Sequence, residues 1–600
     1  MSDSQDAKGS DTDREKPDAA QTVEPRTLED MQHWTGVIGR AQQMMLEHGV
    51  AQMTQAQGRI APGATGSPET WLGSSMRIAQ AQSDFVADSM ALWSRFLDPA
   101  TAPPASPAIN KDRRFAAPQW RDNPLFDLIR QSYLMVADHM LKGVNAIEGV
   151  EPKQKEKLRF ATQAMVDALS PSNFALTNPE VIQKIVETKG ENLVKGLEHL
   201  LADMGKGQLT HTASGKFEVG RNIAMTPGKV IRETPLYQLI QYAPTTETVN
   251  ETPLIIFPPW INRFYILDLN PEKSFIRWAV EQGLTVFIVS WKSADETMGD
   301  VTFDDYVVRG QIDAIDTVRD LLGVEAVHTV GYCVAGTTLA ATLALLTARG
   351  EAAKVASATF FTAQVDFSSA GDLNLFVDDE QLKLLGALSK DKGFLDGRYM
   401  AATFNLLRGR DLIWNYVVNN YLLGHEYPEF DLLHWNGDIT NLPAKWHHSY
   451  LQDMYRDNKL VQPGAISVDG TPIDLTSVKT PSYIQAGRED HIAPAESVWK
   501  ITHHFAGPLR FVLAGSGHIA GVVNPPSANK YQYWINEQGA DSLEAFVAGA
   551  TEIKGSWWPD WVSWIGAQSD KRVPAEGARI PGAGDLPAIE EAPGRYVRLR

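Results

Sequence analysis

The sequence predicts an α/β fold in its C-terminal half, because short apolar runs typical of strands alternate there with segments typical of helices. The runs at 252–260 (TPLIIFPPW) and 284–291 (LTVFIVSW) are continuous and apolar, as in strands that are buried on both faces of a parallel sheet. Residues 303–323 have the pattern of a helix. Three further strand-like runs follow at 355–367, 481–490 and 509–515.

Composition and charge limit the classes of protein to which this chain can belong. Its 600 residues, 43% of them hydrophobic, are enough for two or more domains with at least one large core. The formal net charge of −18 argues against a nucleic-acid binder, which normally carries a basic face. A single cysteine excludes a disulfide framework and fits a reducing compartment. The N-terminus is too polar for a signal peptide, and no apolar run approaches the ~20 residues that span a bilayer, so we expect a cytoplasmic protein without a membrane span.

The region before the α/β pattern divides into four parts. Residues 1–28 are polar and acidic and have almost nothing to bury, which predicts a disordered tail. Residues 29–97 carry large apolar side chains at helical spacing and predict amphipathic helices of unassigned role. The segment 98–110 is a Pro/Ala linker, and residues 111–215 predict a mostly helical N-terminal domain.

Residues 216–566 are predicted to form the catalytic domain. Between about 370 and 460 the strand–helix alternation gives way to a helical, aromatic-rich insertion, at the place where a cap over an active site would lie. The segment 567–600 is rich in proline, glycine and polar residues, and we expect it to form an extended C-terminal tail.

The only cysteine of the chain lies between the strand-like run 327–330 and an Ala/Leu-rich helix. The intervening sequence GYCVAG (331–336) is typical of a nucleophile elbow, a tight strand-to-helix turn whose usual form is G-x-S-x-G. Here Cys333 replaces the serine, and Ala335 stands at the position of the second glycine. The alternative is that Cys333 is a small buried hydrophobic residue, which is the commoner fate of an intracellular cysteine. The choice between them depends on the partners of Cys333.

Two downstream residues supply those partners. Asp490 follows one predicted strand, and His518 follows the next, each in loop-like sequence. In α/β-hydrolases the nucleophile, the acid and the histidine occur in this order, each at the C-terminal edge of the sheet. We therefore predict Cys333, Asp490 and His518 as the catalytic residues of an α/β-hydrolase core with a helical cap insertion, preceded by a mostly helical N-terminal domain.

The predicted roles follow from the chemistry of a thiol. A free thiol is mostly protonated at neutral pH and needs a base or a positive neighbour, which His518 supplies while Asp490 holds the imidazole in the required tautomer. The backbone N–H of Val334 is the predicted first oxyanion donor, and Asn262, in the loop after the strand at 252–260, is the second by position. No H-x-E or C-x-x-C spacing indicates a metal site.

Cysteine in place of serine favours an acyltransferase that uses acyl-CoA over a hydrolase. A serine elbow forms an oxyester, which water normally resolves. A thiolate that exchanges with a thioester makes another thioester at little energetic cost, and the acyl group stays activated for transfer to an alcohol. This preference is an argument from suitability, since cysteine hydrolases on this fold also exist.

At this level of detail the chain resembles the polyhydroxyalkanoate synthases over about residues 110–565. Its length and its N-terminal domain resemble the class I enzymes of that family, which act without a second type of subunit. The segments that carry the resemblance are GYCVAGT (331–337), PPWINRFYILDLNPEKSFIRW (258–278), HWNGDITNLP (434–443), AGREDHIAP (486–494), SGHIAGVVNPP (516–526), SPSNFALTNPE (170–180) and DRRFAAPQWRDNPLF (112–126). At Ala335 many members have glycine, and we expect a modest geometric effect there with no loss of activity.

The resemblance implies a specific reaction. Cys333 would carry the growing chain as a thioester, His518 would activate the thiol, and Asp490 would activate the 3-hydroxyl group of the acyl unit, directly or through His518. The substrate would be (R)-3-hydroxyacyl-CoA, with 3-hydroxybutyryl-CoA as the first expectation. CoA would be released, and no cofactor would be needed because CoA is part of the substrate.

The resemblance also implies partners and a location. The family forms homodimers, the cap gates access to the active site, and the enzymes work in the cytoplasm at the surface of polyester storage granules. The helices predicted within 29–97 would contact the nascent polymer or granule-coat proteins, or else pack on the catalytic domain or the dimer partner.

Two other functions stay open at this stage. The first is an acyl-CoA thioesterase or an intracellular polyester depolymerase with the same three residues, against which the cysteine, the large insertion and the matching segments argue. The second is a non-catalytic granule or scaffold protein with a relic elbow. The complete set of Cys333, Asp490 and His518 in the correct order argues against that second function.

Overall fold

The computed structural model describes residues 112–147 and 149–600, together with a few residues between 80 and 92. The predicted acidic tail (1–28) and the Pro/Ala linker (98–110) lie outside the described residues, as does most of the segment 29–97. The predictions for those segments therefore stay predictions.

An eleven-stranded sheet forms the centre of the C-terminal part, and the predicted α/β fold is confirmed. Its six middle strands are parallel and lie in the order β13 (Leu509–Ala514), β12 (Ser482–Gly487), β7 (Val355–Phe361), β6 (Val327–Tyr332), β4 (Leu254–Phe257) and β5 (Val286–Trp291). Antiparallel strands extend both edges: β14 (Gln532–Ile535) and β15 (Thr551–Lys554) on one side, β2 (Tyr237–Tyr242), β1 (Gly228–Glu233) and β17 (Glu590–Glu591) on the other.

The middle strands are apolar throughout because both faces of the sheet are covered. Every residue of β4, β5 and β6 is buried. Ile255 and Ile256 are neighbours in β4 but belong to two separate apolar cores, since successive side chains of a strand point to opposite faces. The helices α10 (Asp313–Leu322) and α11 (Val334–Ala348) contribute to the first core, and α8 (Phe275–Glu281) and α19 (Trp558–Gln568) contribute to the second.

The insertion between β7 and β12 is a mostly helical cap, which we define as residues 371–456. Its elements are η8 (Gly371–Phe376), α12 (Asp379–Lys390), β8 (Phe394–Leu395), α13 (Gly397–Leu407), η9 (Arg410–Trp414), η10 (Val417–Leu422), α14 (Asp431–Gly437), β9 (Leu442–Pro443), α15 (Ala444–Tyr450) and η11 (Leu451–Arg456). The short strands β8 and β9 pair with each other, so residues far apart in the cap sequence are joined at its centre. An isolated bridge between Ile439 and Asn262 attaches the cap to the loop after β4.

Between residues 112 and 227 the structure describes five α-helices that precede the sheet: α3 (Gln119–Asp122), α4 (Pro124–Ala146), α5 (Pro152–Ala168), α6 (Pro179–Thr188) and α7 (Glu191–Lys206). Three of them begin at a capping side chain followed by proline, a sequence that satisfies a free N–H group and presets the first helical φ angle. The side chains of Asn123 and Asn178 accept hydrogen bonds at the starts of α4 and α6. None of the helices within the described residues is long and apolar enough to cross a membrane.

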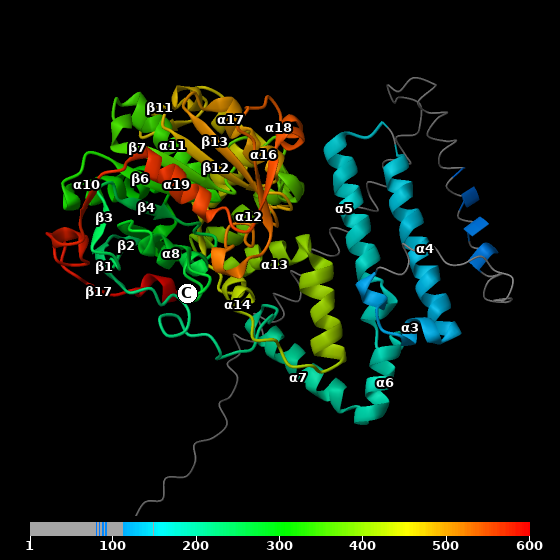
Figure 1. Ribbon diagram of the computed structural model, residues 1–600. Helices are drawn as coiled ribbons and strands as arrows, with labels where there is room; N and C mark the ends of the chain where they lie inside the picture. Colours follow the sequence, from blue (N-terminus) through cyan, green and yellow to red (C-terminus); the bar gives the residue numbers. More distant parts are fainter. Residues whose placement is uncertain (1–79, 81–82, 85–86, 89, 93–111, 148) are drawn as a thin grey trace, which may run out of the picture.

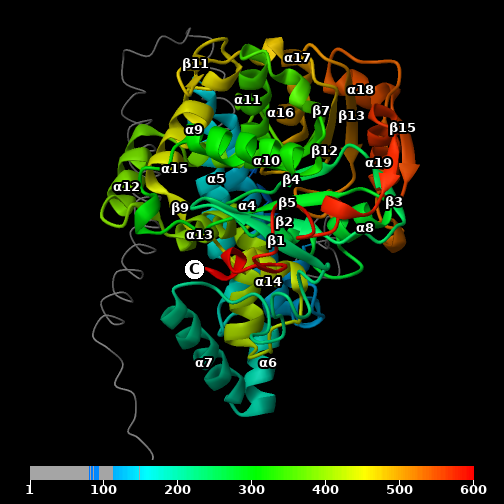
Figure 2. The same cartoon turned by 90° about the vertical axis from the view of Figure 1, so that its left-hand side faces the viewer.

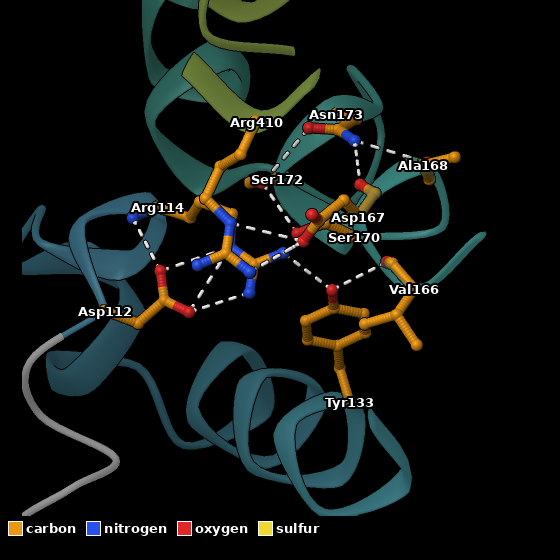
Figure 3. A network of polar contacts seen from close by, with 10 residues as sticks. All are labelled: Asp112, Arg114, Tyr133, Val166, Asp167, Ala168, Ser170, Ser172, Asn173 and Arg410. Atoms are coloured by element: carbon orange, nitrogen blue, oxygen red, sulfur yellow. Dashed lines mark hydrogen bonds and ion pairs between the residues drawn. The ribbon is translucent and has the colours of Figure 1, made fainter. Parts of the chain in front are cut away.

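The N-terminal helices lie beside the sheet domain and are tied to the cap (Figures 1 and 2). Figure 3 shows one tie, at which Asp167 of α5 accepts hydrogen bonds from Arg410 of η9 at 2.7 Å and from Arg114 at 3.2 Å. Arg114 also pairs with Asp112 at 2.7 Å and donates to the hydroxyl of Tyr133. Asp167 is therefore shared between the N-terminal helices and the cap.

A second tie joins α5 to the first segments of the cap. Lys157 forms an ion pair with Asp378 at 2.7 Å, at the N-terminus of α12. The ring of Phe160 meets the edge of Phe376 with their centroids 5.4 Å apart. This apolar and charged contact holds η8 and α12 against α5.

The tail 567–600 folds back onto the sheet domain, whereas its sequence predicted only an extended chain. Its strand β16 (Arg572–Pro574) pairs with β3 (Thr248–Asn250), and β17 forms the edge of the large sheet beside β1. Tyr596 and Val597 are buried. The tail has no regular apolar period, so these strand pairings could not be predicted from its residues.

We predict that Gly196 of α7 is needed for the attachment of this helix to the cap. A Cβ atom at Gly196 would overlap the backbone carbonyl group of Tyr421 in η10, whereas a Cβ at Gly205 of the same helix would meet nothing within 4 Å. Gly196→Ala should therefore loosen α7 and speed proteolysis within 111–215. Gly205→Ala should stabilise the helix by about 0.5–1 kcal/mol.

Limited proteolysis and thermal unfolding of the two variants beside the wild type would check this prediction. Equal protease resistance of Gly196→Ala and Gly205→Ala would contradict it.

Candidate active site

Cys333 lies at the turn between β6 and α11 with a strained backbone, at φ +53° and ψ −125°. A positive φ is uncommon for a residue with a side chain and persists only where the surroundings hold it. The N–H of Cys333 donates to the carbonyl of Phe361 at 2.9 Å, and its carbonyl accepts from the N–H groups of Gly336 at 2.9 Å and Thr337 at 3.1 Å. These bonds fix the turn on both sides, so the geometry is that of a nucleophile elbow.

The two glycines of the motif are required by close packing across the turn. A Cβ at Gly331 would lie 2.6 Å from the Cα of Gly336, and a Cβ at Gly336 would overlap the side chain of Ala363. Ala335 is fully buried, and its carbonyl accepts a hydrogen bond from Gln311 at 2.9 Å. A methyl group is therefore accommodated at position 335 but excluded at 331 and 336.

Asp490 and His518 meet in the loops that follow β12 and β13. Nδ1 of His518 lies 2.7 Å from Oδ2 of Asp490. The other carboxylate oxygen of Asp490 accepts from the backbone N–H groups of Ile492 at 2.8 Å and Ala493 at 2.9 Å, and its side chain is fully buried. Because Nδ1 of His518 faces the fixed carboxylate of Asp490, Nε2 is the ring nitrogen that is available for proton transfer.

Cys333 and His518 line the same cavity and are electrostatically coupled. Burial acts to lower the pKa of His518, but the Asp490 carboxylate and the Cys333 thiolate raise it to about 10. The hydroxyl of Tyr332 donates to the backbone carbonyl of His518 at 2.9 Å and so helps to hold the loop. The arrangement can form a thiolate–imidazolium pair next to a buried carboxylate.

The two predicted oxyanion donors lie near this pair. Val334 is buried and is the first residue of α11, so its N–H has no acceptor within the helix. Asn262 is half-buried, lines the cavity with Cys333, and lies in the loop that the cap bridges through Ile439. Their role as donors stays a prediction.

The cavity has a volume of about 140 Å³ and is enclosed mainly by apolar side chains of the cap. Its apolar lining consists of Pro259, Ile261, Leu373, Phe376, Val377, Leu385, Leu395, Met400, Phe404, Trp435, Trp446, Leu451, Ile492 and Ile519. Phe376 is the residue that α5 holds through Phe160, so the N-terminal helices support one wall. An apolar cavity of this kind beside Cys333 suits an acyl chain.

Most residues of the cavity wall were not predicted from the sequence, and one of them is a histidine. His447, which the sequence alone treats as one of several scattered cap histidines, lines the cavity together with Tyr450 and Leu451. Tyr450 and Leu451 follow His447 by three and four residues, so the three side chains share one face of α15 and its continuation η11. This spacing was the signal in the sequence for a common face. The histidine beside Asp490, His491, is half-buried and is not among the residues that line the cavity.

The elbow, the following acid and histidine, and the capped parallel sheet define the chain as an α/β-hydrolase-fold protein, and the role of Cys333 as its nucleophile stays a prediction. A family model described as "alpha/beta hydrolase fold" matches residues 252–525. A second model, described as "Poly-beta-hydroxybutyrate polymerase (PhaC) N-terminus", matches residues 111–279.

Curated relatives identify the family. The chain is 46% identical to a poly(3-hydroxyalkanoate) polymerase subunit of Rhizobium meliloti over 89% of this chain and 87% of the relative. It is 44% identical to a poly(3-hydroxyalkanoate) polymerase of Methylorubrum extorquens, with 92% and 90% covered, and 42% identical to a polymerase subunit of Cupriavidus necator, with 92% and 93% covered. The chain belongs to the poly(3-hydroxyalkanoate) polymerase family, a family of acyltransferase-type enzymes, and the resemblance seen in the sequence is confirmed.

The packing of the elbow generates one prediction. Gly331→Ala and Gly336→Ala should disrupt the turn and abolish CoA release, because each added methyl would overlap neighbouring atoms. Ala335→Gly should keep its activity and lose about 0.5–1 kcal/mol of stability through the greater backbone freedom of glycine. Thermal unfolding and an assay of CoA release would test the set. Wild-type rates in Gly331→Ala would contradict this account of the turn.

The coupling of His518 to Cys333 generates a second prediction. Because Cys333 is the only thiol, iodoacetamide labels one site, and the reaction rate reports the thiolate. With its pKa raised to about 10, His518 keeps its positive charge beside the sulfur from pH 7 to 9, which favours the thiolate in the wild type. His518→Gln should react at least about tenfold more slowly at pH 7, with a rate that rises with pH as an ordinary thiol ionises.

The matched control is His503→Gln, which changes an exposed histidine of α17 (Ile501–His504). Its labelling should follow the wild type. Identical pH profiles for His518→Gln and the wild type would show that the imidazole does not stabilise the thiolate.

Proposed function

We propose that this chain polymerises (R)-3-hydroxyacyl-CoA, with 3-hydroxybutyryl-CoA as the first expectation, into polyhydroxyalkanoate with release of CoA. The observation that carries the proposal is a cysteine elbow that opens, beside His518, into an apolar cavity under a cap. The relatives named as poly(3-hydroxyalkanoate) polymerases, similar over most of the chain, support it.

In the first half-reaction the thiolate of Cys333 attacks the thioester carbonyl carbon of the substrate. A carbon–sulfur bond to Cys333 forms, and the carbonyl oxygen takes up the negative charge next to the N–H of Val334, with Asn262 as the proposed second donor. The bond to CoA then breaks, and the CoA thiolate leaves with the proton of His518. Cys333 now carries the acyl group, and His518 is neutral.

In the second half-reaction the 3-hydroxyl group of another acyl unit attacks the thioester on Cys333. Neutral His518 takes the hydroxyl proton, and Asp490 stabilises the imidazolium that forms. A carbon–oxygen bond forms, the bond to Cys333 breaks, and the thiolate returns beside protonated His518. The chain is then one ester longer.

The apolar cavity favours this transfer over hydrolysis. Both water and an alcohol can attack a thioester, so polymerisation requires that the hydroxyl of the acyl unit is held at the carbonyl and that water is kept away. The side chains from the cap, such as Leu385, Met400 and Phe404, supply an apolar surface for that purpose. A thioesterase or depolymerase would instead need a path for water to Cys333.

We also propose the partners and setting that the family implies. The enzyme would act as a homodimer in the cytoplasm, at the surface of polyester granules and in contact with granule-coat proteins. It would need no cofactor, because the thiolate, imidazole and carboxylate supply the nucleophile and all the proton transfers, and CoA enters as part of the substrate.

The proposal predicts the product of purified enzyme with (R)-3-hydroxybutyryl-CoA. CoA release should be accompanied by chloroform-soluble polymer, and Cys333→Ala should abolish both because no chain carrier remains. Cys333→Ser should form far less polymer, since an oxyester is a poorer acyl donor than a thioester.

The alternatives give different products in the same assay. Free 3-hydroxybutyrate in place of polymer would make the enzyme a thioesterase. CoA release that is unchanged in Cys333→Ala would remove the cysteine from the mechanism altogether.

A further inference from the structure

His447 is a buried polar side chain on the cap side of the reaction cavity. It lies on α15, which contacts α12 and the β8–β9 pair, and its residue is only 5% exposed. Its ring meets the ring of the preceding Trp446, which is itself fully buried. The position of His447 is therefore fixed by packing rather than by a polar contact.

The imidazole of His447 has no hydrogen-bond partner among the residues that the structure describes, although it lines the cavity. Buried polar groups in proteins are nearly always hydrogen-bonded, because an unpaired buried group costs free energy. The nitrogens of His447 are not among the fully buried atoms that lack a partner, and the residue lines the cavity, so a partner for the ring is expected there.

His447 is one helical turn from Tyr450 on the same face of α15. Tyr450 lines the same cavity as Cys333 and His518. His447 and Tyr450 therefore belong to the part of α15 that forms a wall of the cavity. A substrate attached at Cys333 would occupy this cavity.

The ring is neutral under working conditions. Burial, and to a lesser degree the adjacent His448, lower the pKa of His447 to about 4. A neutral imidazole has one N–H donor and one acceptor nitrogen, which suits an uncharged ligand. The cavity wall near His447 is apolar and includes Trp446 and Leu451.

The ligand that this arrangement fits is a carbonyl oxygen on an otherwise apolar chain. A 3-hydroxyacyl polyester offers one ester carbonyl per unit between apolar groups, and the pantetheine arm of CoA offers amide carbonyls. Both would present an uncharged acceptor to the N–H of the ring.

Resting on the proposed polymerase function, we infer that His447 is a substrate-binding residue that donates a hydrogen bond to a carbonyl oxygen of the acyl chain or of the pantetheine arm. Its loss should weaken substrate binding by about two- to tenfold, the range for one hydrogen bond to an uncharged group. Because the chemistry at Cys333 is untouched, the effect should fall on KM more than on kcat.

The test uses full-length enzyme and compares His447→Phe and His447→Leu, which remove the donor, with His447→Gln, which keeps one. The matched control is His448→Phe, a change at the exposed neighbouring histidine. For each protein one measures KM and kcat for (R)-3-hydroxybutyryl-CoA, the inhibition constant of free CoA, the polymer length and the thermal stability.

We expect KM to rise about two- to tenfold in His447→Phe and His447→Leu, to return close to the wild-type value in His447→Gln, and to stay unchanged in His448→Phe. A parallel rise in the inhibition constant of CoA would assign the pantetheine carbonyl. An unchanged inhibition constant with shorter polymer would assign the ester carbonyl.

Unchanged KM and polymer length in both donor-free variants would overturn the inference. So would equal impairment of His447→Gln and the donor-free variants, which would indicate a packing role. A wild-type enzyme that makes no polymer would instead refute the proposed function, so the two failures are distinguishable.

Discussion

The close approach of Gly331 to Gly336 is the contact on which the rest of the site depends. It allows β6 to turn directly into α11, and this sharp turn places Cys333 at positive φ with its side chain free of the sheet. A hydrogen bond from the N–H of Cys333 to the carbonyl of Phe361, and bonds from the N–H groups of Gly336 and Thr337 to the carbonyl of Cys333, offset the strain. The N–H groups at the start of α11, which have no acceptor within the helix, then lie beside Cys333.

The parallel sheet brings the other groups to the same edge. The strands β13, β12, β7 and β6 lie side by side in this order, and their carboxyl ends share one edge of the sheet. The residues that follow β6, β12 and β13 therefore converge although they are far apart in sequence. Asp490 is fixed by two backbone N–H groups, and it in turn fixes His518. The cap adds what the sheet edge lacks, an apolar enclosure around the sulfur, and the N-terminal helices support that enclosure from outside.

The sheet, the elbow and the pairing of Asp490 with His518 could be predicted from sequence, because continuous apolar runs mark buried parallel strands and their loops must meet at one edge. The position of His447 could not, since a single polar residue in a helix does not show whether its face meets solvent or a cavity. The ties between α5 and the cap also left no local signal: Asp167 and Arg410 are ordinary charged residues until the fold brings them together. The strand pairings of the C-terminal tail depend on long-range partners in the same way.

The sharing of Asp167 between Arg114 and Arg410 has a thermodynamic consequence. The docking of the N-terminal helices and the ordering of the cap depend on the same contacts of Asp167, so the free energies of these two processes are linked. Any molecule that binds the helices more tightly when they are docked on η8 and η9 must, by reciprocity, favour the docked cap to the same extent. A ligand that fills the cavity and steadies the cap must equally steady helices that it never touches.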